Sequence, residues 1–463
     1  MTMPQIYKFQ QDVIDVASTM DNFAFLWEPG SGKTCAVINT VLQKLGKFPK
    51  TLIFAPKIAL NNWKNELKMW APDERPEILM GNSDKKKKII DRSHILILNY
   101  EAVRGKEVLE VLQDFQPTVV ILDESHRIKD PRSLQSKAIY KITRTARYRY
   151  ILTGTVATNS YMDLWSQWHF LDNGDSLGSS FFSFRKKYFI NKNAGWVSDK
   201  AFPNYVFNEA MKPELLSRIS HNSSFIKAKD VVDLPDLIKQ DLYLPMVSDQ
   251  RTHYDAVKNE LITWIDGAED NPLVVQNALT KVLRLNEILN GFMRLEDGTI
   301  HAFTSNPKLH ALVDLVEDLS PHKVIVFCVF KEDYNLLRKS LKCKYVELHG
   351  EVSAEDKFKN IDAFNDMNSD IRVCIANPKS CGIAINLKSA KYAVFYSRNF
   401  SLEEYIQASG RNYRSGSKDI HDKVVHYNII MENTIDAAIV DILENKRDTL
   451  NSLAAIKNML LSS

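Results

Sequence analysis

Short, uninterrupted apolar runs alternate with helical stretches in the first third of the chain. The runs cover residues 23–26, 51–55, 95–98, 118–122 and 150–152, and segments 35–45 and 61–70 have helical patterns. Strands that are apolar at every position are buried on both faces, as in a parallel sheet covered by helices. The pattern therefore predicts an α/β lobe here.

Polar residues follow these predicted strands. They are Pro56-Lys57, Asn99-Tyr100, the cluster 123–126 and the cluster 153–155. Open α/β sheets bind ligands at the carboxyl ends of their strands. We expect a binding site at this edge.

The alternation returns after Pro307, with predicted strands at 323–328, 345–348, 371–375, 392–396 and 424–428. We expect a second parallel α/β lobe without a phosphate loop. Between about 160 and 300 the pattern is mainly helical, at 164–171, 211–219 and long parts of 250–293. A helical stripe there is predicted to be core: Leu279, Val282, Leu283, Leu285, Ile288 and Leu289.

Length and composition fit a globular protein of two or three domains. The chain has 463 residues, of which 44% are hydrophobic and 25% charged, as is typical of soluble proteins. No apolar run reaches 18 residues and residues 1–5 do not start a signal peptide, so we expect neither a membrane span nor secretion. The cysteines lack metal-ligand spacing, favouring a reducing, intracellular compartment, and Cys35, Cys328 and Cys374 are expected to be buried.

The net charge of +3 permits a nucleic-acid partner without demanding one. The run Lys85–Lys88 is more typical of a solvated helix start or loop than of a binding site.

Residues 27–34, Trp-Glu-Pro-Gly-Ser-Gly-Lys-Thr, join the first predicted strand to the first long helix. Glycines let backbone N–H groups surround a phosphate at a helix N-terminus, and a lysine and a threonine there can reach the β/γ-phosphates and Mg²⁺. The usual G-x-x-x-x-G-K-[ST] pattern has glycine where Trp27 stands. The expected phosphate-binding residues are Pro29, Gly30, Ser31, Gly32, Lys33 and Thr34, with Thr34 also a metal ligand.

Gln10 precedes this loop in a predicted helix. Its amide could bind the edges of adenine and select ATP. The alternative is an exposed helix residue.

Asp123 and Glu124 directly follow a predicted buried strand. Asp123 is a candidate ligand of Mg²⁺, and Glu124 is a candidate base that orients and deprotonates the attacking water. The alternative is a solvated acidic turn. His126 is expected to couple hydrolysis to Thr153, Gly154 and Thr155, unless it is only a packed, hydrogen-bonded histidine.

Nine aromatic residues lie between Phe181 and Phe207, with Arg185, Lys186 and Lys187 among them. Such residues can stack on bases and bind phosphates, so part of 194–206, with Trp196 and Tyr205, is a candidate wedge at a DNA junction. The alternative, which we favour, is the small core of a helical protrusion.

Several of these stretches together resemble the motifs of superfamily 2 helicases, in their SNF2-like branch. They are 30–34, Pro56-Lys57, Asn62-Trp63 with Glu66, 123–129, 152–155, 163–165, 170–172 and 184–188. The segment 225–235 resembles the linker of this branch without its paired arginines. The chain departs from the family at Ser125 and Val156, where alanine and proline are usual.

The second half continues the resemblance. Residues 377–387, which include Gly382, resemble motif V, and 407–416, which begin at Gln407, resemble motif VI. Arg411 and Arg414 are three residues apart, on one face if the segment is helical. A planar guanidinium suits the charge on transferring phosphoryl oxygens. In this frame Arg414 is the candidate arginine finger, and Arg411 is expected to assist it or to brace the interface of the lobes.

The resemblance implies two tandem RecA-like parallel-sheet lobes with helical insertions and ATP in the cleft between them. We expect lobe 1 at 1–228, with a helical and aromatic protrusion at about 160–225. Lobe 2 is expected at 229–463, with a linker and helical insertion at about 229–305 and its core at about 306–463. ATP and Mg²⁺ are the implied cofactors. DNA is the implied partner, with backbone contacts from Lys57, Arg104, Lys129 and Lys379.

The expected function is an ATP-dependent DNA helicase or translocase, closest to compact phage enzymes that act on forked or branched DNA in replication, recombination or repair. Such a protein would work in the cytoplasm of a bacterial or infected cell, at the nucleoid if cellular. The alternatives are a duplex translocase that displaces proteins without separating strands, an RNA helicase, and a non-catalytic DNA-binding scaffold.

Overall fold

The structure is a computed structural model of the whole chain. It describes residues 6–154, 161–192, 205–231, 233–266, 272–295, 297–380, 385–414 and 416–444. The chain divides into two compact units. Unit 1 comprises Met1–Trp196 and Pro203–Val232, and unit 2 comprises Val197–Phe202 and Asp233–Ser463.

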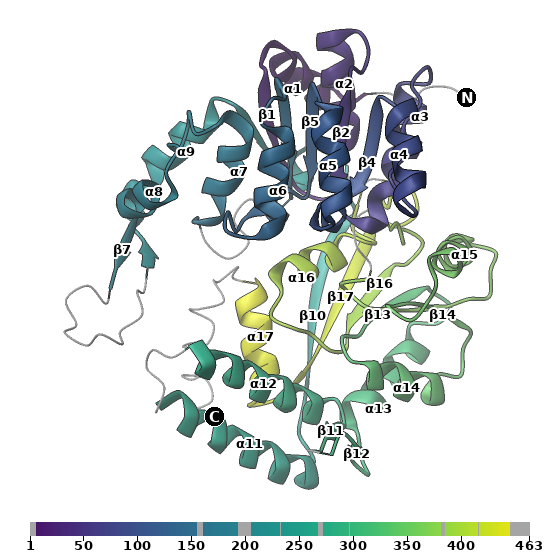
Figure 1. Cartoon of the computed structure of the whole chain (residues 1–463). Helices are drawn as coiled ribbons and strands as arrows, with labels where there is room; N and C mark the ends of the chain where they lie inside the picture. Colours follow the sequence, from purple (N-terminus) through teal and green to yellow (C-terminus); the bar gives the residue numbers. More distant parts are fainter. Residues whose placement is uncertain are drawn as a thin grey trace. The chain divides into compact units, whose positions relative to one another are not determined.

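Unit 1 is built on a seven-stranded parallel sheet with the order β3-β4-β2-β5-β6-β1-β9 (Figure 1). The strands are β1 (Asn22–Trp27), β2 (Thr51–Ala55), β3 (Glu77–Ile78), β4 (Ile95–Asn99), β5 (Val119–Asp123), β6 (Tyr148–Leu152) and β9 (Ser223–Ile226). The five predicted strands are all present. Every residue of β2, β5 and β6 is buried, which explains their uninterrupted apolar runs.

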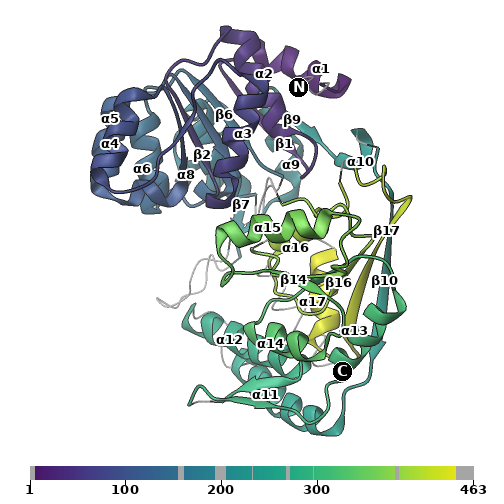
Figure 2. The ribbon, with the colours of Figure 1, turned by 90° about the vertical axis from the view of Figure 1, so that its right-hand side faces the viewer.

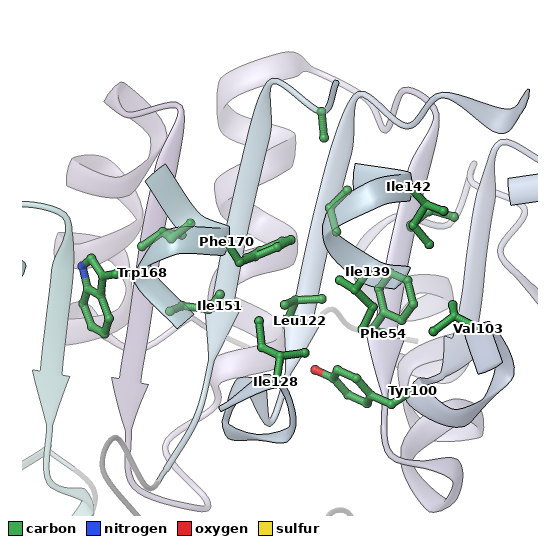
Figure 3. Packing of buried hydrophobic residues seen from close by; sticks show 14 of the residues in the cluster. Phe54, Tyr100, Val103, Leu122, Ile128, Ile139, Ile142, Ile151, Trp168 and Phe170 are labelled. Carbon is green, nitrogen blue, oxygen red and sulfur yellow. The ribbon is translucent and has the colours of Figure 1, made fainter. Parts of the chain in front are cut away.

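In unit 1, helix α1 precedes β1, and six further α-helices and three 3₁₀ turns lie between strands of this sheet. The helices are α1 (Lys8–Thr19), α2 (Lys33–Leu45), α3 (Leu60–Trp70), α4 (Ser83–Arg92), α5 (Lys106–Phe115), α6 (Leu134–Thr143) and α7 (Asp163–Asp172). The turns are η1 (Lys57–Ala59), η2 (Tyr100–Arg104) and η3 (Ser125–Ile128). Figure 3 shows Leu122 and Ile151, from neighbouring strands, packed with Phe170 of α7 and Ile139 of α6.

A smaller group of elements follows α7. It consists of α8 (Phe181–Tyr188), the antiparallel hairpin of β7 (Phe189–Asn191) and β8 (Tyr205–Phe207), η4 (Glu209–Met211), α9 (Lys212–Ser220) and α10 (Ala228–Val231). In Figure 1, α8 and β7 extend away from the sheet of unit 1.

Strand β9 corrects the sequence analysis, which placed Phe225 and Ile226 in a linker. These residues instead pair in parallel with β1, opposite Leu26 and Trp27. The strand escaped prediction because it is a short edge strand with two serines, and Phe225 is exposed.

Unit 2 has a six-stranded parallel sheet with the order β10-β17-β16-β13-β15-β14. The strands are β10 (Asp236–Leu244), β13 (Val324–Phe327), β14 (Tyr345–Leu348), β15 (Val373–Ala376), β16 (Tyr392–Phe395) and β17 (Lys423–Met431). Figure 2 shows β10 beside β17, and their register covers nine residue pairs, from Asp236↔Lys423 to Leu244↔Met431. Strand β10 was not predicted because its polar residues interrupt any apolar run.

The helices of unit 2 are α11 (Ser248–Asp266), α12 (Pro272–Leu289), α13 (Pro307–Asp318), α14 (Lys331–Ser340), α15 (Ala354–Asn365), α16 (Leu402–Ser409) and α17 (Ile435–Glu444). A hairpin of β11 (Phe292–Arg294) and β12 (Ile300–Ala302) follows α12. The predicted stripe on α12 is buried at Val282, Leu285, Ile288 and Leu289, but Leu283 is 44% exposed, so that part of the prediction is wrong. The side chain of Leu279 lies outside the described residues.

Three smaller predictions concern surface and burial. Cys35, Cys328 and Cys374 are buried, as predicted. The lysine run lies in α4, where Lys85, Lys87 and Lys88 are exposed and Lys86 is half-buried, as expected for a solvated helix. No helix in the described ranges is long and apolar enough to cross a membrane.

Candidate active site

The loop between β1 and α2 has the backbone that its glycines predict. Gly30 and Gly32 have φ angles of 85° and 82°, a region that side chains other than glycine rarely adopt. Trp27 is the last residue of β1, where the chain is still extended and no glycine is needed. Its indole is fully buried and packs edge-on against Phe25, with ring centroids 5.5 Å apart. The departure from the usual pattern at position 27 therefore leaves the loop geometry intact.

Lys33 begins α2, and its ammonium turns back onto the loop. Nζ donates to the carbonyl oxygens of Trp27 at 2.8 Å and Glu28 at 3.4 Å. Burial lowers the pKa of Lys33, while the negative charges of Glu124 and Asp123 raise it. Phosphate oxygens would give this ammonium stronger, charge-assisted hydrogen bonds than neutral carbonyls do. The lysine is thus placed where a bound phosphate can compete for it.

Gln10 lies against the same loop. Its side chain is 4% exposed, so the interpretation as an exposed helix residue is wrong. Nε2 donates to the carbonyl of Ser31 at 3.0 Å, and Oε1 accepts from the backbone N–H of Tyr7 at 3.0 Å. A Cβ on residue 32 would lie 2.2 Å from Nε2, so Gly32 is also needed for this close approach. The role of Gln10 toward adenine stays a prediction.

Asp123 is the last residue of β5, and its carboxylate is buried. It is 4% exposed and Glu124 is 6% exposed, so the solvated acidic turn is excluded. Oδ2 of Asp123 accepts from Nε1 of Trp63, on α3, at 2.8 Å. Burial raises the pKa of Asp123 to about 6 and the neighbouring charge of Glu124 adds to this, while the Trp63 hydrogen bond and the Lys33 charge oppose it. The Trp63 hydrogen bond therefore fixes the orientation of the Asp123 carboxylate, and the nearby Lys33 only partly balances its negative charge.

Glu124 has a left-handed backbone, with φ 55° and ψ 55°. A residue other than glycine held in this region stores strain, which often accompanies function. Its Oε2 lies 3.2 Å from Nδ1 of His126, and the same nitrogen lies 3.3 Å from Oγ1 of Thr153 at the end of β6. The structure thus brings three of the predicted catalytic and coupling residues into contact. Thr155 lies outside the described residues.

Gly154 joins this group to the phosphate loop. A Cβ at position 154 would lie 3.0 Å from Cδ of Pro29 and 3.4 Å from the carbonyl oxygen of Trp27. Glycine suits this position because a Cβ would make the loop or the end of β6 shift slightly. The polar residues after β1, β5 and β6 therefore form one site. This agrees with the prediction of a site at the carboxyl ends of these strands.

The donor set suits a magnesium ion held jointly with phosphates. Mg²⁺ takes one or two protein oxygens and completes its shell with phosphate and water, and Thr34 and Asp123 supply a hydroxyl and a carboxylate. The partly balanced charge of Asp123 fits a cation there. No cluster of three or more histidine, cysteine or acidic ligands occurs among the residues that the structure describes, and this kind of site needs none.

Arg411 and Arg414 follow the end of α16 in a turn, so the helical face considered from the sequence is wrong. Their guanidinium groups still converge. Nη1 of Arg411 donates to the carbonyl of Ile385 at 3.0 Å, and Nη1 of Arg414 donates to the same carbonyl at 3.1 Å. Arg411 is 4% exposed, and burial lowers the pKa of Arg414.

The other residues of unit 2 that were predicted to bind nucleotide or DNA make fewer contacts in the described part of the chain. Gln407 is half-buried on α16, where its Nε2 donates to Glu403 at 3.2 Å. Lys379 follows β15 and is exposed. Gly382 lies outside the described residues.

Three predicted DNA-binding residues belong to unit 1 and follow the carboxyl ends of β2, β4 and β5. Lys57 is exposed. Arg104 is also exposed, and its Nη2 donates to Oε1 of Gln135 at 3.1 Å. Lys129 is half-buried, 3.8 Å from a carboxylate oxygen of Asp163. They lie at the edge of the sheet that carries the phosphate loop, and their contact with DNA stays a prediction.

The aromatic segment forms a local core, as the favoured alternative predicted. Phe184, Tyr188 and Phe189 are buried, and the guanidinium of Arg185 lies 4.1 Å from the ring centre of Tyr205. Phe182, at 64% exposure, remains on the surface. Trp196 lies outside the described residues.

Trp63 is the site residue whose role was missed. The sequence analysis noted Trp63 only as part of a resemblance, because spacing alone cannot pair an indole with a carboxylate 60 positions away. Tyr100 was likewise noted only as a polar residue after a strand, although its hydroxyl donates to the carbonyl of Asp123 at 2.7 Å. The hydrogen-bond donors that hold Asp123 come from elements that only the fold brings together.

Comparisons with known proteins identify the family of the chain. The family model of the SNF2-related domain matches residues 19–293, and that of the helicase conserved C-terminal domain matches 307–416. The p41 protein of Acyrthosiphon pisum secondary endosymbiont phage 1 is 26% identical over 94% of this chain and 93% of its own length.

Two longer relatives match over part of their length. The ISWI chromatin-remodeling complex ATPase ISW1 of Saccharomyces cerevisiae is 25% identical over 89% of this chain and 37% of its own. An ATP-dependent helicase of Mycoplasma genitalium is 25% identical over 91% of this chain and 39% of its own. The chain thus spans about two-fifths of these two proteins.

Among solved structures, the Sulfolobus solfataricus SWI2/SNF2 ATPase core in complex with dsDNA is similar, at 23% identity and a TM-score of 0.45. The match covers 100% of this chain and 94% of that one. The SNF2-related domain model alone matches more than half of the sequence. The chain therefore belongs to the SNF2-related family of helicase-type ATPases.

Proposed function

We propose that this protein is an ATP-driven motor that moves on duplex or branched DNA and remodels forks or junctions, as phage-type replication, recombination or repair requires. The observation that carries the proposal is the connection from Glu124 through His126 to Thr153, beside the loop that holds Lys33. A protein that only bound DNA would have no use for two buried acids beside a phosphate loop.

In this proposal, unit 1 binds the nucleotide. N–H groups of the loop surround the phosphates, and Lys33 exchanges the carbonyls of Trp27 and Glu28 for phosphate oxygens. Thr34 and Asp123 would hold Mg²⁺, which would neutralise charge on the phosphates. Trp63 orients the Asp123 carboxylate through its indole N–H.

Glu124 orients the attacking water and takes its proton. Its carboxylate lies 3.2 Å from Nδ1 of His126, which also contacts Thr153, so we expect a change at the acid to reach the end of β6. This path is how we expect hydrolysis to be communicated within unit 1.

Arg414 of unit 2 stabilises the charge that develops on the phosphoryl oxygens, and Arg411 assists. Both guanidinium groups donate to the carbonyl of Ile385, and this neutral acceptor is weaker than a phosphate oxygen. Arg414 can therefore leave it at modest cost.

DNA is bound chiefly through its phosphates, because contacts that carry no sequence information allow a motor to step. Lys57, Arg104, Lys129 and Lys379 are the proposed contacts. Their mixed exposure predicts that Lys57 and Lys379 contribute more than the half-buried Lys129.

The test is the rate of ATP hydrolysis with duplex, single-stranded, forked and four-way DNA and with RNA. We expect stimulation by DNA, strongest with forked or four-way substrates, and little by RNA. Stimulation by RNA alone would favour an RNA helicase. A Lys33→Ala protein that kept full biological activity would favour the non-catalytic scaffold.

The second candidate is a duplex translocase that does not separate strands. The hairpin β7–β8 offers the exposed Ile190 beside the basic helix α8, whereas Tyr205 is partly buried under the guanidinium of Arg185. A fork-unwinding assay beside a triplex-displacement assay distinguishes the two candidates. Replacing Trp196 and Tyr205 with alanine should reduce unwinding more than hydrolysis, and equal losses would contradict the wedge.

A further inference from the structure

Glu28, in the phosphate loop, makes two hydrogen bonds to one distant segment. Its backbone N–H donates to the carbonyl of Ile226 at 2.9 Å, and its Oε2 accepts from the backbone N–H of Ala228 at 3.0 Å. Ile226 ends β9 and Ala228 begins α10. The residue thus binds the same segment through its main chain and its side chain.

Trp27 strengthens this connection. Its Nε1 donates to Oγ of Ser224 at 3.1 Å, and its backbone pairs with Ile226 in the β1–β9 register. Glycine, usual in the loop pattern at this position, could not make the indole contact. Two consecutive loop residues therefore join the phosphate loop to residues 224–228.

On its other side, Glu28 is bound to the groups that would meet a nucleotide. Its carbonyl accepts from Oγ of Ser31 at 2.7 Å and from Nζ of Lys33 at 3.4 Å. When Lys33 turns to a phosphate, the carbonyls of Trp27 and Glu28 lose a charged donor. The backbone that positions the Glu28 carboxylate then changes its partners.

The segment bound by Glu28 leads out of unit 1. After α10 the chain continues into β10, which begins at Asp236 and belongs to the sheet of unit 2. A change at Ala228 is therefore a change at the start of the connection between the units.

We propose that Glu28 is a positioning residue that transmits nucleotide occupancy of the phosphate loop to residues 226–231. The inference rests on the proposed function, because it requires the loop to bind ATP. Glu28 does not touch the reacting atoms in this scheme. It makes the exit segment respond to the nucleotide and so couples hydrolysis to movement.

The matched control is Glu74, another acid of unit 1 whose carboxylate accepts from a backbone N–H, that of Phe48 at 2.8 Å. It belongs to the loop after α3 and contacts His94, not the phosphate loop. Glu28→Ala and Glu74→Ala each remove an acceptor of the same kind. Glu28→Gln keeps an acceptor oxygen and should restore the link in part.

The first measurement is hydrogen exchange of amides 226–231 in the full chain, with and without ADP or a non-hydrolysable ATP analogue. In the wild type we expect nucleotide to change exchange in this segment. In Glu28→Ala we expect exchange without nucleotide to rise about tenfold or more and the nucleotide response to disappear. Glu74→Ala should keep the wild-type response.

The second measurement is the ratio of triplex displacement to ATP hydrolysis. Glu28→Ala should lower this ratio about fivefold or more, as expected for a lost hydrogen bond to a charged group, and Glu28→Gln should recover much of it. Two results would contradict the proposed role of Glu28 without affecting the proposed function. In the first, the wild type binds nucleotide but amides 226–231 do not respond. In the second, Glu28→Ala behaves like Glu74→Ala. If the wild type binds no nucleotide, the proposed function and the link both fail.

Discussion

The acidic residues of unit 1 and the arginines of unit 2 are held in different ways. Asp123 is fixed by the indole of Trp63, and Glu124 contacts His126, so side chains from several elements orient the acids. Arg411 and Arg414 instead donate to the backbone carbonyl of Ile385. Preorganised groups aimed at a reacting centre stabilise a transition state most. In the proposed mechanism, side chains orient the acids of unit 1 before ATP binds, and Arg414 has to exchange the carbonyl of Ile385 for a phosphate oxygen.

The largest effect should come from Arg414, the proposed arginine finger. Arg414→Lys keeps a positive charge but loses the planar fork, so we expect kcat for ATP hydrolysis to fall on the order of 10³-fold with nucleotide affinity little changed. Steady-state hydrolysis and binding of a fluorescent ADP measure the two quantities. Arg338→Lys is the control, because that guanidinium pairs with Glu347 at 2.7 Å on another part of unit 2. Equal losses of kcat in both variants would contradict the role of Arg414 as the arginine finger.

Glu124→Gln should be the next most severe change. The amide keeps the shape of the side chain but cannot take a proton, so we expect kcat to fall about 10²-fold or more. Binding of the fluorescent ADP should persist because Lys33 and the loop are unchanged. Glu101→Gln alters an acid at the same edge of the sheet that pairs with Arg127 at 3.2 Å, and should hydrolyse ATP normally. A Glu124→Gln protein with normal kcat would exclude Glu124 as the base.

The same contrast explains how far sequence alone could predict this protein. The phosphate loop and the Asp123-Glu124 pair were predictable because each follows an apolar strand and lies within a few residues of its motif. Trp63 was not, because its contact with Asp123 depends on how α3 packs against β4 and α2. Buried strands were found from apolar runs, whereas edge strands β9 and β10 were missed because exposed strands carry polar residues.

The arginines show a different limit. Their motif predicted that Arg411 and Arg414 act together, but not the turn that replaces a helix or the shared carbonyl of Ile385. The spacing of two residues in the sequence shows whether their side chains are close only when the local backbone conformation is known. In the same way, the glycine pattern could not explain Trp27, whose extended backbone and contact with Ser224 are properties of the sheet.

Asp123→Asn tests the cost of keeping an acid buried in unit 1. The pKa of Asp123 rises from 3.8 to about 6 in the folded state, so folding disfavours the ionised carboxylate. The cost is therefore present above pH 6, decreases as pH falls through 6, and is absent below about 4. We expect the variant to raise the free energy of unfolding by about 2 kcal/mol at pH 7 and by little at pH 4.

Urea unfolding at a series of pH values measures this difference. Asp84→Asn, which changes an exposed acid in the first turn of α4, is the control and should show no such pH dependence. A stabilisation that is the same at pH 4 and pH 7 would show that ionisation of Asp123 is not its cause.

The smallest effect should come from the residue that holds Asp123 in place. Trp63→Phe keeps the buried ring but removes the N–H that donates to Oδ2, and this hydrogen bond lowers the pKa of Asp123. Without it the pKa should rise above about 6, toward neutral pH, so a larger share of Asp123 is protonated and unable to bind Mg²⁺. We expect the acidic limb of kcat/KM to move to higher pH and activity at pH 7 to fall about tenfold, with partial rescue at pH 8.5.

Trp70→Phe is the matched control on the same helix, because its indole donates to Glu66 at 3.0 Å and not to Asp123. If both variants lose activity equally at every pH, Trp63 supports only the packing of α3, and the acids of unit 1 are less firmly organised than their contacts indicate.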